Sequence, residues 1–529
     1  MLEAARGGIR VSTPDYDGFL GYITTVKDQF LKKLEHEKSM VFIITHHDAD
    51  GISAGSVMAS ALQRQQIPFQ ARVVKQISSK YIGDIIERPR AEMSGNETPD
   101  QDNERPEKFF VFTDFGSGQL DFLARNIDRS RVLILDHHEI EAVKDEALLS
   151  GMLHVNPWLF GINGSEEISG AGVAYLFAKA INPDNKDLAP LAITGALGDM
   201  QDKGDKTSLA GLNRVIVEDA KNMGLISETL DLKVFGRYSR PIHLALSFTM
   251  DPFLPGLSGD ETACANFVQR LQIPVKQPGT EKSRTIADMT ADEKSRFVSA
   301  LIEWSMQHGL SAATIKGLVG NIYVLENEDP STNLKDLREF ASMLNSCGRQ
   351  GFGGIGIAIA MGDRKEIFAE GQHVIGEYRK KIANYMDWIH MTNAIKKRDN
   401  LQVLEGAAYI DDAMIGTLVS MLLNSRAIGT DSPVVGWTEI KDDPDAVKIS
   451  ARAVQSLVDR GLNLGTAIRD TLKELDIDSP GGGHAPAAGV EIPKAKLDKF
   501  LRALGKRTAM QLQSSGSNPQ APKKTQSWI

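Results

Sequence analysis

In the first 230 residues of this 529-residue chain, short apolar runs alternate with helical segments. This pattern limits the possible folds more than any other feature of the sequence. Three such runs, Val41–Thr45, Phe109–Thr113 and Val132–Leu135, are rich in β-branched or aromatic residues, and a helical pattern over Ser53–Gln65 lies between the first two. Continuously apolar short strands are buried on both faces, which is typical of parallel sheets with helices on each side. The sequence therefore predicts an α/β fold with a parallel, doubly wound sheet.

The rest of the chain divides into segments of different pattern. Proline-rich turns around Asp251–Gly256 and a helical stretch over Ala291–His308 indicate an inserted or connecting domain. Helical periodicity over Ile375–Lys397 predicts a long linker helix, after which strand-like runs alternate with helices. The expected divisions are a first α/β domain over 1–230, a connecting domain over 231–370, a linker helix over 371–400, a smaller α/β domain over 401–509 and a disordered tail over 510–529.

Composition excludes several classes of function. The apolar runs fall far short of the ~18 residues that a membrane span requires, and the N-terminus lacks the apolar core of an export signal. We therefore expect a cytoplasmic protein with no membrane partner. The two cysteines, Cys264 and Cys347, are too few for a disulfide framework or a thiolate zinc site, so a metal must be held by oxygen and nitrogen. The net charge of −9 disfavours nonspecific adhesion to nucleic acid but leaves room for a locally basic groove.

The segment that follows the first apolar run, Thr45–Gly51, carries two histidines and two aspartates. In extended backbone alternate side chains project to the same side, so we expect His46, Asp48 and Asp50 to converge beyond the end of the strand. Open α/β sheets bind their ligands at this edge. The alternative is an acidic turn in which Asp50 caps a helix that begins near Ser53.

Ionisable side chains also follow the other two runs. Asp114 follows the second, Asp136, His137 and His138 follow the third, and Asp199 ends a later segment of small residues. Like charges in a shared cleft repel one another unless cations are bound there. These groups therefore predict a metal centre at one edge of the sheet.

The candidate ligands suffice for two adjacent divalent ions. Carboxylate and imidazole ligands without thiolate suit manganese, with magnesium possible and zinc or iron less suitable. Asp114 would bridge the ions, and Asp136 would orient an imidazole by hydrogen bonding to it. Paired divalent ions serve displacement at phosphorus. The candidate ligands are His46, Asp48, Asp50, Asp114, His137 and Asp199.

These motifs carry a family resemblance. In the glycine-rich segment Gly481–Gly489 the chain resembles the DHH-associated substrate-binding domain. The stretches Phe248–Gly256 and Leu344–Arg349 are similar to archaeal RecJ-like proteins, including the GINS-associated nuclease. The chain also resembles the four motifs of the DHH phosphoesterase superfamily, in order, at His46-x-Asp48-x-Asp50-Gly51, Asp114, Asp136-His137-His138 and Gly198-Asp199.

The resemblance implies roles for the matching positions. His138 would contact the scissile phosphate, which makes His138 and Asp136 the catalytic pair. The related inorganic pyrophosphatases separate their first His and Asp by three residues rather than one, which disfavours that activity. No ligand position is missing, which argues against the degenerate relatives that serve as helicase scaffolds. One ion would be held by His46, Asp48 and Asp114, and the other by Asp50, Asp114, His137 and Asp199.

Candidate substrate contacts lie in the second α/β domain. The strand alternation of Lys448–Arg452 places Ser450 and Arg452 on one face, where they would bind a phosphate. The alternative is a half-exposed edge strand with solvated charges. Beside His484, the glycines Gly481, Gly482 and Gly483 offer backbone amides without Cβ atoms, suited to surrounding a phosphate or terminal nucleotide. The alternative is a flexible loop.

Basic residues with interspersed aromatic side chains occur on the predicted linker helix. The basic groups are Arg379–Lys381 and Lys396–Arg398, and the interspersed aromatic residues are Tyr378, Tyr385 and Trp388. Backbone charge contacts combined with stacking hold single strands without reading their sequence. The alternative is that these charges form solvated helix faces.

The sequence therefore predicts a RecJ-like, two-metal phosphodiesterase, a single-strand-specific exonuclease that releases mononucleotides from DNA or RNA in replication or repair. Two alternatives stay open. One keeps the chemistry but acts on short oligoribonucleotides or a cyclic dinucleotide. The other is a replisome scaffold that binds GINS and the replicative helicase, with the apolar end Ser527–Ile529 as a docking peptide.

Overall fold

The computed structural model divides the chain into two units. Unit 1 comprises Met1–Phe248 and Glu261–Gly376, and unit 2 comprises Thr249–Asp260 and Glu377–Ile529. The three prolines and many polar residues of Arg88–Lys108 predict a long surface loop, and its residues up to 106 fall outside the described part of the chain. The structure describes residues 13–37, 39–75, 107–140, 143, 146–249, 252, 254–310, 312–424, 428–441, 443–479 and 481–514.

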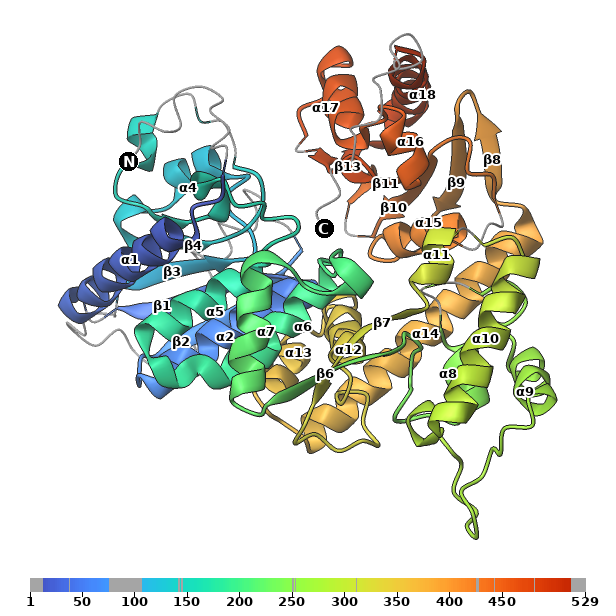
Figure 1. The fold of residues 1–529 in the computed structure, drawn as a ribbon. Coiled ribbons are helices and arrows are strands. Elements are labelled where there is room, and N and C mark those ends of the chain that lie inside the picture. The colour runs from blue at the N-terminus through green and yellow to red at the C-terminus, as the bar shows by residue number, and fades with distance from the viewer. Residues whose placement is uncertain are drawn as a thin grey trace, which may run out of the picture. The chain divides into compact units, whose positions relative to one another are not determined.

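A five-stranded sheet forms the centre of unit 1 (Figure 1). All of its strand pairs are parallel, in the order β2-β1-β3-β4-β5. The predicted parallel sheet of an α/β fold is therefore confirmed. Because β1, β3 and β4 are neighbours, their carboxyl ends meet at one edge. The strands are β1 (Met40–His46), β2 (Phe69–Val74), β3 (Lys108–Thr113), β4 (Val132–Leu135) and β5 (Leu153–Val155).

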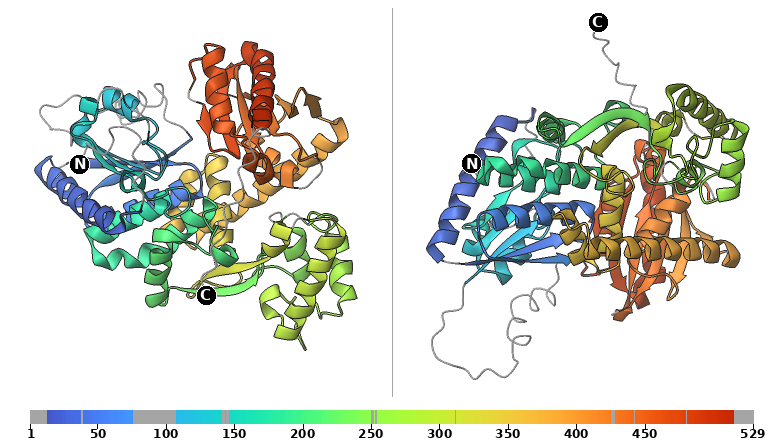
Figure 2. Two further views of the ribbon diagram at one scale, coloured as in Figure 1. Left: turned by 45° about the horizontal axis from the view of Figure 1, so that its top comes forward. Right: turned by 90° about the horizontal axis from the view of Figure 1, so that it is seen from below.

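Helices cover both faces of this sheet (Figures 1 and 2). In β1, Val41 and Ile43 pack into a core with α1, α2 and α5, whereas Phe42 and Ile44 pack into a second core with α4. This alternation follows from the two-residue period of a strand and accounts for the continuously apolar sequence. The helices of this part are α1 (Tyr16–Glu37), α2 (Ala49–Arg64), α4 (Leu120–Asn126), α5 (Gly170–Ile181), α6 (Ala189–Gly198) and α7 (Gly211–Asn222).

The remainder of unit 1 is mainly helical. An antiparallel pair, β6 (Ile226–Leu232) with β7 (Val319–Leu325), joins it to the sheet region. The most important helix for the site is α12 (Leu337–Arg349), which packs against α2 and α6. The other helices are α8 (Ile242–Ser247), α9 (Glu261–Arg270), α10 (Ala291–Gln307), α11 (Ala312–Lys316), α13 (Gly353–Ala360) and α14 (Glu366–Thr392), the last of which continues into unit 2.

Unit 2 is built on a six-stranded mixed sheet in the order β12-β13-β11-β10-β9-β8. Only the β9–β10 pair is parallel. One face packs with α15, and the other packs with α17 and α18. The elements are β8 (Ile395–Arg398), β9 (Leu401–Ala407), α15 (Ile415–Asn424), β10 (Val434–Ile440), β11 (Asp443–Arg452), α16 (Gln455–Asp459), α17 (Leu464–Glu474), β12 (Gly482–Gly483), β13 (Ala487–Pro493) and α18 (Leu497–Ser514).

The linker helix was predicted too far toward the C-terminus. Helix α14 ends at Thr392, and Asn393 adopts a left-handed backbone conformation (φ 50°) that terminates it. The following residues form β8, which pairs with β9 through a tight turn. The basic group Lys396–Arg398 therefore lies on a strand and not on the helix.

The C-terminal tail was predicted to begin too early. Helix α18 continues to Ser514, and Gln511 donates hydrogen bonds to the Asn463 carbonyl and the Thr466 hydroxyl at the start of α17. These contacts explain why the polar sequence at this point is helical. Residues 515–529, including the apolar end Ser527–Ile529, fall outside the described residues. The division of the chain at residues 230, 370 and 400 stays a prediction.

No helix within the described ranges is long and apolar enough to cross a lipid bilayer.

Candidate metal centre

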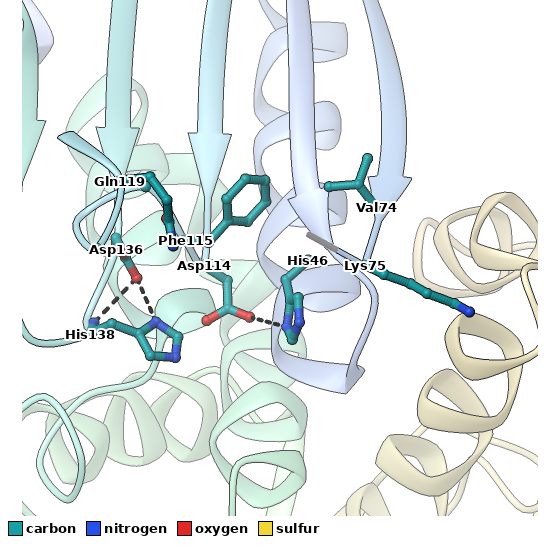
Figure 3. Close-up of a pocket in the computed structure, with 10 residues that line it drawn as sticks. His46, Val74, Lys75, Asp114, Phe115, Gln119, Asp136 and His138 are labelled. Atoms are coloured by element: carbon teal, nitrogen blue, oxygen red, sulfur yellow. Dashed lines mark hydrogen bonds and ion pairs between the residues drawn. The ribbon is translucent and has the colours of Figure 1, made fainter. Parts of the chain in front are cut away.

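Three neighbouring strands deliver ionisable side chains to one edge of the parallel sheet. His46 is the last residue of β1, Asp114 follows β3, and Asp136 follows β4. Figure 3 shows Asp114 between His46 and His138, at the carboxyl ends of the strands. The sequence predicted this convergence, because the ends of parallel neighbours meet at one edge.

Asp48 and Asp50 reach this edge by a different route from the one expected. Helix α2 begins at Ala49, and Asp48 is its N-cap, accepting a hydrogen bond of 3.0 Å from the Gly51 amide. Asp50 lies in the first helical turn and is 1% exposed. The expected extended run is therefore wrong, and so is the alternative in which Asp50 is the cap.

His46, Asp48 and Asp114 form the first ligand group. His46 Nδ1 lies 3.0 Å from Asp48 Oδ2 and 3.5 Å from Asp114 Oδ2. Burial alone would lower the pKa of His46, but the two carboxylates outweigh it and raise this pKa well above its usual value. Burial likewise opposes ionisation of Asp48, yet His46 holds the pKa of Asp48 well below its usual value.

Asp50, His137 and Asp199 form the second ligand group. His137 Nε2 lies 3.6 Å from Asp50 Oδ2 and 3.9 Å from Asp199 Oδ2, and only 3.2 Å from Asp114 Oδ1. Asp114 thus faces one group with each of its oxygens. Burial and the negative charge of Asp114 raise the pKa of Asp50 well above its usual value. This repulsion is the one that the sequence predicted for a shared cleft.

The chemistry of Asp114 tests whether the site fits cations. Its carboxylate is 1% exposed, and within the described residues its oxygens face His46 Nδ1 at 3.5 Å and His137 Nε2 at 3.2 Å without a well-aligned hydrogen bond. Burying a carboxylate costs free energy unless charges and hydrogen bonds compensate it, and two imidazoles at these distances compensate one carboxylate only in part because Asp48, Asp50 and Asp199 lie nearby. Divalent cations between the two groups would remove this cost. The donor set of carboxylate and imidazole, without thiolate, fits manganese or magnesium.

The N-terminus of α5 also supports the site, which the sequence reasoning missed. The Gly170 amide donates to Asp50 Oδ2 (2.7 Å) and the Ala171 amide to Asp50 Oδ1 (2.9 Å). Gly170 must be a glycine, because a Cβ atom would lie 2.5 Å from Asp114 Oδ1. The available signal was Ser169, a helix N-cap followed by small residues.

Asp136 organises the loop that follows β4. Its Oδ1 accepts hydrogen bonds from the His137 and His138 amides and lies 2.8 Å from His138 Nδ1, while Oδ2 accepts from the Ser117 amide. Burial alone would raise the pKa of Asp136, but the nearby imidazoles outweigh burial and lower this pKa. Asp136 thus orients His138, whereas the Gly164 carbonyl, 2.7 Å from His137 Nδ1, orients His137.

Behind this loop lies a buried polar network that the sequence reasoning also missed. Asn156 donates to the His138 carbonyl (2.9 Å) and to the Ser117 hydroxyl (2.8 Å). Ser117 Oγ is 2.9 Å from His154 Nε2, and burial lowers the pKa of His154 to about 4. A neutral His154 therefore fixes the back of the loop at physiological pH. Elsewhere, Gln201 plays a similar part by donating to Asp199 Oδ2.

Helix α12 holds the loop between β1 and α2 although it lies almost 300 residues further along the chain. Asn345 Oδ1 accepts a hydrogen bond of 2.9 Å from the Ala49 amide. A Cβ atom on Gly348 would overlap the His47 carbonyl oxygen and lie 2.7 Å from its carbon. The resemblance noted over Leu344–Arg349 therefore includes two residues that position the loop between β1 and α2.

The candidate phosphate contacts of β11 belong to unit 2. Arg452 Nε donates to the Ser420 hydroxyl (3.1 Å), and Nη1 donates to the Ser450 hydroxyl (3.0 Å). Ser450 is 6% exposed. The guanidinium is therefore pre-oriented by two hydroxyl groups, and it is not the solvated charge of the alternative interpretation. Lys448 instead lies 3.7 Å from Glu491.

The glycine run of unit 2 is not a loose loop. Gly482 and Gly483 form β12, which pairs with β13, and the His484 amide donates to the Ala487 carbonyl at the turn. Gly481 also lies close to Val490, where a Cβ atom would approach to 2.6 Å. The glycines therefore permit close packing, and their use for substrate stays a prediction.

The aromatic residues of α14 differ from one another in exposure. Tyr378 and Tyr385 are buried, at 7% and 9% exposure, and pack into the core around α15. Trp388 stacks on Tyr409, with ring centroids 4.5 Å apart. The expectation that all three rings stack on nucleic acid is therefore wrong for Tyr378 and Tyr385, because they fill the core.

Binding of Mn²⁺ is expected to release protons and to strengthen as the pH rises. Metal ligands bind in their deprotonated forms. Burial and the charge of Asp114 raise the pKa of Asp50, and nearby carboxylates raise the pKa values of His46 and His137 against the effect of burial. Calorimetric titration with Mn²⁺ in buffers of different ionisation enthalpy would measure the protons released. Equal heats in all buffers would contradict the prediction.

The fold and the site define an α/β protein with carboxylate–imidazole groups gathered around Asp114, among them a third group of Asp114, Asp136, His137 and His138 that could also hold an ion. Three family models match the chain: the N-terminal domain of the DHH family over residues 40–196, the DHH-CID domain over 234–319 and the DHHA1 domain over 399–509. An uncharacterized protein from Methanocaldococcus jannaschii is 30% identical over 490 residues, which cover 93% of this chain and 98% of that protein. The chain belongs to the DHH superfamily and is RecJ-like, as its motifs predicted.

Solved structures agree on the fold. CDC45 from Entamoeba histolytica superposes with a TM-score of 0.59 at 14% identity, covering 92% of this chain and 99% of that one. RecJ in complex with Mn²⁺ from Thermus thermophilus gives a TM-score of 0.52 at 15% identity, covering 92% of this chain and 55% of that one. At such low identity the likeness establishes the fold alone.

Proposed function

We propose that the protein is a metal-dependent, RecJ-like exonuclease of the cytoplasm. It hydrolyses phosphodiester bonds of single-stranded DNA, with RNA as a further substrate, to mononucleotides during DNA replication or repair. The observation that carries this proposal is the buried carboxylate of Asp114, which belongs to one ligand group and faces His137 of the other at 3.2 Å. The cofactors would be two divalent ions, manganese in preference to magnesium.

The side chains around Asp114 would hold the divalent ions and orient the groups that contact the substrate phosphate. Divalent ions, when bound to the two ligand groups, supply Lewis-acid activation of the phosphoryl group. His138 is held at Nδ1 by Asp136, which leaves Nε2 as the ring nitrogen that contacts a phosphoryl oxygen. Burial opposes protonation of His138, but the carboxylate of Asp136 overcomes it and raises the pKa of His138. A protonated imidazole donates to developing negative charge.

Digestion of end-labelled strands tests this function. With Mn²⁺, single-stranded DNA and RNA labelled at either end should release labelled mononucleotides from one end, and a blunt duplex should resist. Chelation should stop the reaction. Internal cleavage, or no cleavage of either strand, would contradict the proposal.

The preferred substrate length distinguishes the exonuclease from the alternative that shares its chemistry, an oligoribonuclease or cyclic-dinucleotide phosphodiesterase. A preference for two- to five-nucleotide substrates over long strands, or hydrolysis of a cyclic dinucleotide, would indicate the oligoribonuclease or cyclic-dinucleotide alternative. The metal centre is the same in both cases, so this comparison addresses the substrate alone.

A replisome scaffold that binds GINS and the replicative helicase is a second candidate function. The likeness to CDC45 over nearly the whole of that chain favours it, and it is compatible with hydrolysis. Pull-down of GINS with the full chain and with a chain that lacks residues 515–529, which leaves α18 intact, would test both the partner and the docking peptide.

Replacing Arg452 with Ala is expected chiefly to raise KM for strands, by about 10- to 150-fold. This range corresponds to the ~1.5–3 kcal/mol of a hydrogen bond to a charged group. Its hydrogen bonds to Ser420 and Ser450 pre-orient the guanidinium for a phosphate. Steady-state kinetics would separate KM from kcat, with Arg460→Ala as the control on α16's C-terminal end. An unchanged KM would remove Arg452 from the substrate contacts.

A further inference from the structure

A small pocket adjoins the metal centre in unit 1. Its volume is about 250 Å³, and it shares His46, Asp114 and His138 with the metal centre. Its other walls include Val74, Phe115 and Gln119 (Figure 3). Pockets for drug-sized ligands measure roughly 300–1,000 Å³, so this one suits a single small group next to the reacting centre.

Phe115 gives the pocket an aromatic wall in a fixed position. Its ring meets Phe112 edge-on, with centroids 5.9 Å apart, and lies 6.4 Å from the ring of His46. The chain turns sharply on both sides, because Asp114 and Gly116 have positive φ angles of 64° and 121°. The turn thus places an aromatic ring directly after the aspartate that faces both ligand groups.

Gln119 supplies the polar part of the pocket. Its Oε1 atom is buried, and no donor from the described residues reaches it. The orientation of this carboxamide is therefore not fixed by a hydrogen bond through its oxygen. A glutamine presents one acceptor and two donors on a planar group, which is the complement of the edge of a nucleobase.

We propose that this pocket binds the nucleobase adjacent to the scissile phosphate, with Phe115 stacking on the base and Gln119 hydrogen-bonding to its edge. The inference rests on the proposed function and names part of its substrate. Stacking accepts any base because each has a π-face, and the carboxamide can turn to suit donors or acceptors. The subsite therefore recognises the presence of a base rather than its identity.

Binding of products in the presence of Mn²⁺ tests the subsite apart from catalysis, because a mononucleotide contains no phosphodiester bond to hydrolyse. The probes are adenosine monophosphate, cytidine monophosphate and ribose 5-phosphate, titrated calorimetrically into the full chain. The wild type should bind both nucleotides at least about 5-fold more tightly than the sugar phosphate, as expected for ~1–3 kcal/mol of stacking per base. Phe115→Leu should lose this preference, and Phe115→Tyr should retain it.

Phe122→Leu is the matched control, because Phe122 packs against the same core cluster as Phe115 but does not line the pocket. Equal binding of nucleotide and sugar phosphate by the wild type would overturn the inference. A nucleotide preference that survives in Phe115→Leu would overturn it as well. Release of mononucleotides from long end-labelled single strands by the wild type, measured separately, tests the proposed function, so the two failures are distinguishable.

Discussion

Asp114→Asn is expected to abolish metal-dependent hydrolysis without unfolding the protein. Asp114 faces both ligand groups, so its replacement weakens both sites together. We expect turnover to fall at least about 1,000-fold, equivalent to about 4 kcal/mol of transition-state stabilisation. Asn is the appropriate replacement because position 114 has a φ of 64°, a conformation that Asn tolerates and most other residues avoid.

Thermal unfolding with and without Mn²⁺ separates this effect from misfolding. An ion at 100 times its Kd stabilises a protein by ~2.7 kcal/mol, so the wild type should gain several degrees and Asp114→Asn should gain little. Asp121→Asn on α4 is the control, since its exposed ion pair with Arg125 contributes little. Normal turnover by Asp114→Asn would refute the site.

Gly348→Ala is expected to destabilise unit 1 and to weaken Mn²⁺ binding. By intrinsic helix propensity alone, alanine would stabilise the helix by about 1 kcal/mol relative to glycine. Here the added methyl group would overlap the backbone carbonyl of His47, which cannot turn aside as a side chain does. Overpacking costs about 1–3 kcal/mol and sometimes more, so we expect a net loss of stability. The displaced loop carries His46 and Asp48, and affinity for Mn²⁺ should therefore fall at least about 10-fold.

Gly376→Ala is the matched control, because we expect it to raise the free energy of unfolding that Gly348→Ala lowers. Gly376 also lies in a helix, but nothing lies within 4 Å of the position that its Cβ would take. This change should stabilise the protein by about 0.5–1 kcal/mol. Denaturant unfolding and Mn²⁺ titration of both variants would measure the difference. If Gly348→Ala proves as stable as Gly376→Ala, the close approach of α12 does not constrain the loop.

The parallel sheet and the clustering of the ligands were predictable from local sequence. The apolar runs of β1, β3 and β4 reflect burial on both faces, and Asp114 and Asp136 follow directly on strands whose ends must meet. The route of Asp50 was not predictable in the same way. Its helix begins at Ala49 because Asp48 serves as N-cap, and a sequence of alternating acidic residues is equally compatible with a strand.

Contacts between distant segments were beyond the reach of pattern reasoning. The Gly170 amide meets Asp50 across 120 positions, and Asn345 meets the Ala49 amide across 296. Such pairings depend on how helices pack, and periodicity carries no information about them. The end of α14 was missed for a related reason, because Asn393 and the pairing of β8 with β9 override a helical pattern.

The position of α12 in the chain determines when, during synthesis, the loop between β1 and α2 gains its last contacts. The chain emerges from the ribosome N-terminus first, and domains generally fold as they appear. The strands that bear the ligands are complete by about residue 155, but Asn345 and Gly348 arrive much later. In the nascent chain the loop between β1 and α2 therefore lacks its contacts with α12 until some 350 residues have been translated, although all six predicted ligands have been made by residue 199.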